Sequence, residues 1–110
     1  MESIIDCVNE QIKLLLQKSL STARNYGELP EIESCEIIVE MPREEMHGDF
    51  STNFAMQIAK KAGKSPIYVA QTLIKNLDTR GTYVERAECA GCGFINFFLK
   101  NGWLYDALRL

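Results

Sequence analysis

The stretch YVERAECAGCGFINFFL, residues 83–99, predicts a β-hairpin. Residues 83–89 and 94–99 have strand character, and they flank Ala90-Gly91-Cys92-Gly93, a short glycine-containing segment of the kind that joins antiparallel strands. Side chains alternate between the two faces of a strand. Ile95, Phe97 and Leu99 therefore share one face of the second strand, and we expect that face to pack on the core.

The opposite face of the same strand carries Phe94, Asn96 and Phe98, and we expect Phe94 and Asn96 to point out to solvent there. An aromatic ring and an amide two residues apart suit the recognition of RNA, because the ring can stack on an unstacked base while the amide hydrogen-bonds its edge. The alternative is that helices cover both faces of the sheet. Phe94 and Phe98 would then be buried, and Asn96 would be bonded to backbone.

Helical periodicity dominates the first third of the chain. Apolar residues recur at steps of three and four from Ile5 to Leu20, and they predict a helix that ends before Tyr26. Ser3 can cap it, with Asp6 three residues further on. Residues 36–41 are short and β-branched, and they predict a strand that is closed by Pro42.

Three more helices are predicted downstream. Asp49 is the expected N-cap of a helix that carries Phe50, Phe54 and Ile58 and stops at Gly63. Ser65-Pro66 then starts a helix that runs to Leu77. A last helix, capped by Asn101, continues to Leu110 without a stop signal, so we expect the sequence to be a piece of a longer protein.

The element order α-β-α-α-β-β-α predicts one α+β domain over residues 1–110. Its small antiparallel sheet has three or four strands, with helices mainly on one face. The composition, 46% hydrophobic and 25% charged, is that of a globular chain rather than a disordered one. Neither an apolar run of ~18 residues nor a secretory signal occurs, so we expect no membrane contact and a cytoplasmic location.

The charge distribution leaves two interpretations open. The formal net charge of −3 argues against simple electrostatic capture of nucleic acid. Residues 28–45 hold seven acids and one base, whereas residues 46–110 hold eight bases and five acids. The second half could therefore face a polyanion. Alternatively, the acids form a solvated loop and the lysines cover ordinary helix surfaces.

The pair Cys89 and Cys92 has CxxC spacing, but its context favours neither redox chemistry nor zinc. A redox CxxC lies at a helix N-terminus, and a zinc site needs a second pair at ligand spacing. We therefore expect structural or incidental thiols and no metal site, with a thiol or metal protein as the alternative. His47 is interpreted as a loop residue without a catalytic role.

Two segments resemble the N-terminal region of bacterial-type arginyl-tRNA synthetases: HGDFSTNFAM, residues 47–56, and ECAGCGFINFFL, residues 88–99. Both occur in the family's order, with the helix that starts at Pro66 between them. One position departs from the pattern, since Cys92 stands where the family usually has proline. That departure makes the CxxC spacing accidental.

The resemblance implies an additional α+β domain that docks on the outer corner of tRNA(Arg) and helps recognise an exposed D-loop base. The family's recognition residues match Phe94, for stacking, and Asn96, for hydrogen bonding. Gly91 lies where some members make a further contact. The weaker candidates, for packing and for phosphate contact, are Phe98, Lys60, Lys61 and Lys64.

The resemblance also implies what these residues do not do. The family's ATP-binding signatures are absent from residues 1–110, so no catalytic residue and no cofactor are expected here. The resemblance implies a longer parent protein that uses ATP with magnesium to attach arginine to tRNA(Arg). In that parent, the ATP-binding signatures would lie in a catalytic domain, which is followed by an anticodon-binding domain. The alternative is a structural or protein-interaction appendage that makes no direct base contact.

Overall fold

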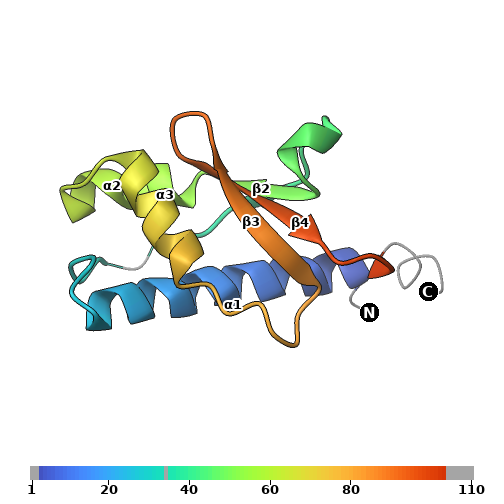
Figure 1. The fold of residues 1–110 in the computed structure, drawn as a ribbon, viewed down its shortest axis with the longest axis horizontal. Coiled ribbons are helices and arrows are strands. Elements are labelled where there is room, and N and C mark those ends of the chain that lie inside the picture. Colours follow the sequence, from blue (N-terminus) through green and yellow to red (C-terminus); the bar gives the residue numbers. More distant parts are fainter. Residues whose placement is uncertain (1–2, 34, 104–110) are drawn as a thin grey trace.

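Within residues 3–33 and 35–103, which the computed structural model describes, three α-helices surround one side of a four-stranded antiparallel sheet (Figure 1). The order of the strands across the sheet is β1-β2-β4-β3. The elements in chain order are α1 (Ile4–Asn25), β1 (Val39–Glu40), a 3-10 turn η1 (Glu45–His47), β2 (Phe50–Thr52), α2 (Phe54–Ala62), α3 (Pro66–Lys75), β3 (Val84–Ala90) and β4 (Phe94–Leu99).

Helix α1 runs along the length of the molecule and forms the base of the fold (Figure 1). Its start is fixed by the expected capping box, in which the Ser3 side chain accepts from the Asp6 N–H and the Asp6 carboxylate accepts from the Ser3 N–H. Its apolar stripe shares one hydrophobic cluster with α2, α3 and the sheet residues Phe50, Ile95 and Phe97. The predicted α+β fold with helices mainly on one face is confirmed.

The segment after residue 49 departs from the predicted helix. Residues Phe50–Thr52 form strand β2, which pairs with β4 in the register Phe50↔Phe97 and Thr52↔Ile95. Helix α2 begins only at Phe54, and Thr52 Oγ1 accepts from the Phe54 N–H. The observed order is therefore α-β-β-α-α-β-β, because pairing with a distant strand overrides the local helical spacing.

Asp49 is consequently not the N-cap of α2; Asn53 occupies that position. The N–H of Asp49 donates to the Phe97 carbonyl at 2.9 Å, and its carboxylate accepts from the Leu99 N–H at 2.9 Å. Gly48, at a φ of 83°, lies so close to β4 that a Cβ would be 2.7 Å from the Phe97 carbonyl oxygen. The His47–Asp49 motif thus holds this segment against β4.

The predicted hairpin is confirmed, with Ala90 opposite Phe94 across the turn. Gly93, at a φ of 132°, brings the turn against α3, where a Cβ would lie 2.7 Å from the Pro66 side chain. The strand expected over residues 36–41 shortens to Val39–Glu40. The last predicted helix falls largely on residues 104–110, outside the described residues. In the part of the chain that is described, no helix has the length and apolar character needed to cross a membrane.

Candidate nucleic-acid interface

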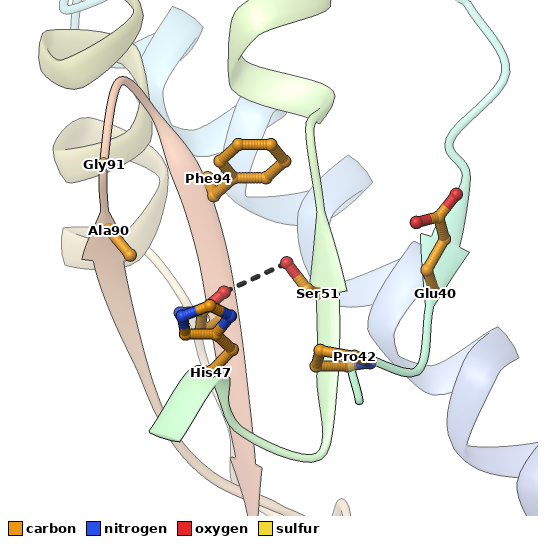
Figure 2. A pocket seen from close by; sticks show the side chains of 8 residues that line it. Glu40, Pro42, His47, Ser51, Ala90, Gly91 and Phe94 are labelled. Carbon is orange, nitrogen blue, oxygen red and sulfur yellow. Dashed lines mark hydrogen bonds between the residues drawn. The ribbon is translucent and has the colours of Figure 1, made fainter. Parts of the chain in front are cut away.

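A pocket opens where the β3–β4 hairpin meets β2 and the segment around η1, on the sheet face opposite the core (Figure 2). Its volume is about 340 Å³, within the range of small-molecule sites. No residue of α1, α2 or α3 lines it. The lining residues are Glu40, Pro42, His47, Ser51, Ala90, Gly91, Phe94 and Asn96.

Phe94 forms one end of this pocket (Figure 2). It is the first residue of β4, directly after the turn, and it is 42% exposed although most large apolar side chains of the sheet are buried. The sequence-based expectation of an exposed ring is met at this position. An accessible aromatic face beside a turn can stack on a planar ligand.

Asn96 lies at the floor of the pocket and is only 5% exposed, so it does not point out to solvent as we expected for both residues. The reason is the unexpected strand β2, which places Ser51 directly opposite it. Ser51 Oγ donates to Asn96 Oδ1 at 3.0 Å. Asn96 Nδ2 has no hydrogen-bond partner among the described residues, and it is not fully enclosed.

Gly91 and Phe98, the other two predicted contacts on the hairpin, differ in their accessibility. Gly91 is exposed in the turn and lines the pocket. Phe98 is half-buried and does not line it; the guanidinium of Arg86 lies 3.9 Å from its ring centroid. The Arg86 guanidinium therefore covers one face of the Phe98 ring. An ion pair between Arg86 and Glu88, at 3.0 Å, helps to hold the guanidinium in this position.

The three candidate lysines lie apart from the pocket lining. Lys60 and Lys61 are in the last turn of α2, and Lys64 follows the helix; all three are exposed. Lys64 Nζ lies 5.3 Å from the centroid of the Tyr68 ring. These cations can contact phosphate, but none of them is placed to contact a base held in the pocket.

Five lining residues were not predicted from the sequence, and three of them, Glu40, His47 and Ser51, have polar side chains. His47 is exposed at the end of the pocket opposite Phe94 (Figure 2), and its Nε2 is 3.9 Å from the Glu44 carboxylate. His47 and Ser51 belong to the HGDFSTNFAM segment, which lies beside β4 because of long-range strand pairing. That segment's spacing alone predicts a helix.

The cysteines do not gather into a site in the described part of the chain, where no group of three or more metal-ligating side chains occurs. Cys89 is half-buried in β3, whereas Cys92 is exposed in the turn with its Sγ 3.5 Å from Met56 Sδ. The two thiols therefore occupy different surroundings despite their CxxC spacing.

Comparison with models of protein families gives a match that covers the sheet and the pocket. A model described as "Arginyl tRNA synthetase N terminal domain" matches residues 10–99. The chain belongs to this family. The matched range includes the whole sheet and every residue that lines the pocket.

Curated bacterial relatives of this arginyl-tRNA synthetase domain are similar along its whole length. The chain is 48% identical over 110 residues to an arginine–tRNA ligase of Acetivibrio thermocellus and 46% identical to one of Ruminiclostridium cellulolyticum. All of this chain is covered in both comparisons, but only 20% of each relative. The chain thus spans about a fifth of the length of these ligases.

Solved arginyl-tRNA synthetases contain the same fold. The Thermus thermophilus enzyme superposes with a TM-score of 0.61 at 26% identity, covering 86% of this chain and 15% of that one. The Plasmodium falciparum enzyme superposes with a TM-score of 0.71 at 24% identity, covering 94% of this chain and 18% of that one. The second likeness concerns the fold alone.

Proposed function

We propose that this domain docks on the corner of tRNA(Arg) and holds an exposed D-loop base in the pocket between Phe94 and Asn96. The observation that carries the proposal is the Asn96 amide, whose Nδ2 is unpaired within the described residues at the floor of a pocket beside an exposed ring. Because Nδ2 is not fully enclosed, an acceptor on a base can reach it and pair with this free donor.

The two side chains have different parts in this proposal. Phe94 stacks on the base, a contact worth ~1–3 kcal/mol, and supplies affinity with little dependence on sequence. Asn96 donates from Nδ2 to an acceptor on the base edge and supplies selectivity. Gly91 lets the backbone of the turn approach the same nucleotide.

Further contacts belong to the periphery of the proposed interface. Lys60, Lys61 and Lys64 contact phosphates of the tRNA backbone, which adds affinity without base selectivity. Phe98 contributes through packing beneath Arg86. This division agrees with the positions of these residues outside the pocket.

The parent activity is part of the same proposal. We place the domain in a cytoplasmic arginine–tRNA ligase that uses ATP with magnesium to form arginyl-adenylate and then charges tRNA(Arg). The proposal assigns catalysis and anticodon binding to other domains of that chain. The family membership and the bacterial relatives support this assignment.

Phe94→Ala and Asn96→Ala in the full-length enzyme test the proposal. Each should lower kcat/KM for tRNA charging about 5- to 150-fold, as expected for the loss of 1–3 kcal/mol, and leave arginine-dependent ATP–pyrophosphate exchange unchanged. Gln57→Ala, an exposed position on α2, is the matched control and should alter neither activity. Equal losses in charging and exchange, or no loss of charging, would favour a structural appendage instead.

A further inference from the structure

Ser51 and Asn96 form the centre of the β2–β4 pairing. They lie directly opposite one another in the antiparallel register, so their side chains project from the same face of the sheet. The Ser51 hydroxyl donates to Asn96 Oδ1 at 3.0 Å, and both residues line the pocket. No other hydrogen bond to the Asn96 side chain occurs within the described residues.

A carboxamide can occupy two orientations that differ by exchange of its oxygen and its nitrogen. A hydroxyl can donate to the amide oxygen or accept from the amide nitrogen, so it engages one edge of the amide in either orientation. At Asn96 the oxygen faces Ser51 and the NH₂ group is turned away from it, and the 95% burial of the residue restricts other movements of the side chain. One edge of the amide is therefore engaged, and the other is held in place, before any ligand arrives.

We infer that Ser51 is a positioning residue, which engages one edge of the Asn96 amide and thereby holds the other edge, the NH₂ group in this structure, toward an acceptor atom of the bound base, a ring nitrogen or a carbonyl oxygen. The inference rests on the proposed function and adds to it the origin of base selectivity. Without the Ser51 hydroxyl, neither edge of the amide is engaged, so the side chain can rotate and bond a base edge in more than one geometry, and base edges other than the natural one are then accepted as well.

A purely structural role for the same hydrogen bond makes a different prediction. A cross-strand bond that only stabilises the sheet would affect the unfolding transition and the charging of all tRNAs alike. A positioning role changes the discrimination, which is the ratio of kcat/KM for natural tRNA(Arg) to kcat/KM for a transcript with one D-loop base replaced.

The experiment measures that ratio in the full-length enzyme, with transcripts in which each D-loop base is replaced in turn. Ser51→Ala should lower the discrimination at the recognised base about threefold to tenfold, and Ser51→Thr, which keeps the hydroxyl, should retain it. Ser51→Val has the shape of the threonine variant without the hydroxyl, and it should behave like Ser51→Ala. This pair keeps the comparison valid if the alanine variant folds poorly.

The matched control is Thr52→Ala, which removes a hydroxyl from the adjacent residue on the opposite face of β2. Thr52 Oγ1 donates to the Ile38 carbonyl at 2.7 Å, so its loss should lower the melting temperature and leave the discrimination unchanged. Unaltered discrimination in Ser51→Ala and Ser51→Val would overturn the inference, provided that Asn96→Ala still lowers it. If Asn96→Ala and Phe94→Ala also have no effect, the proposed function itself is overturned, and the inference with it.

Discussion

The carboxylate of Asp49 accepts a hydrogen bond from the backbone N–H of Leu99 across 2.9 Å, although the two residues are fifty positions apart in the chain. The Asp49 N–H donates to the carbonyl of Phe97, so a single residue bonds to the β4 backbone at two points. This contact lies just before β2 and fixes where that strand meets β4. The floor of the pocket depends on the same pairing, since it places Ser51 opposite Asn96.

Asp49→Ala should therefore destabilise the domain by about 1–3 kcal/mol, because the Leu99 N–H loses a charged acceptor in a partly buried position. Urea denaturation of the 110-residue chain measures this change. Glu44→Ala removes an exposed carboxylate from the same loop and should cost much less. Equal losses for the two variants would show that the bond to Leu99 is not what stabilises this segment.

Gly48 and Gly27 provide a second matched pair, because both have a positive φ and differ in what surrounds them. A Cβ at Gly27 meets nothing within 4 Å, whereas a Cβ at Gly48 would lie 2.7 Å from the Phe97 carbonyl oxygen. Gly27→Ala should cost about 1–2 kcal/mol from its backbone conformation alone.

Gly48→Ala should cost clearly more than Gly27→Ala, because the loop must also move away from β4 to relieve the contact. Denaturant midpoints of the two variants give the comparison directly. A Gly48→Ala chain no less stable than Gly27→Ala would mean that the approach to β4 is not close in solution.

Local signals predicted those elements whose ends are set by neighbouring residues. The Ser3 and Asp6 capping box, and the Ser65 cap followed by Pro66, give α1 and α3 their starts. The β3–β4 hairpin follows from alternation and from its glycine-containing turn. Each of these features is encoded within a few residues, so the sequence alone suffices to predict them.

Strand β2 could not be predicted in the same way. Phe50 and Phe54 are spaced by four residues and suit a helix, but Phe50, Thr52 and Phe54 also alternate as in a strand. Residues 50–52 form a strand rather than a helix because they pair with β4, which is more than forty residues away in the chain. The depth of Asn96 depends on the same pairing, so the sequence predicted its face of the sheet but not its burial.

The exposed pair of Asp78 and Arg80 offers a test by titration. Hydrogen bonds from the Arg80 side chain and backbone lower the pKa of the Asp78 carboxyl from 3.8 to about 2. The folded-state pKa is depressed, so the pair stabilises the fold above pH ~4, and this contribution disappears as the pH falls toward 2.

Carboxyl carbon NMR of the 110-residue chain measures the Asp78 pKa directly. Arg80→Ala should raise this pKa toward its ordinary value without restoring it fully, because the hydrogen bonds from the side chain and the positive charge are lost while the backbone N–H of residue 80 still donates to Asp78. An Asp78 that titrates near 3.8 in the unaltered chain would show that the pair is not formed in solution.

In the proposed complex, the pocket holds a base of tRNA(Arg) through the Asn96 amide. The most direct test follows the side-chain NH₂ signals of Asn96 in a ¹⁵N-labelled 110-residue chain during titration with an RNA hairpin that copies the D-arm of tRNA(Arg). We predict that these signals shift with the natural loop and stay in place with a hairpin whose loop nucleotides are abasic, while those of the exposed Asn53 do not move with either RNA. Asn96 signals that remain unchanged at saturating natural hairpin, while signals on another surface shift, would show that this pocket does not bind the base.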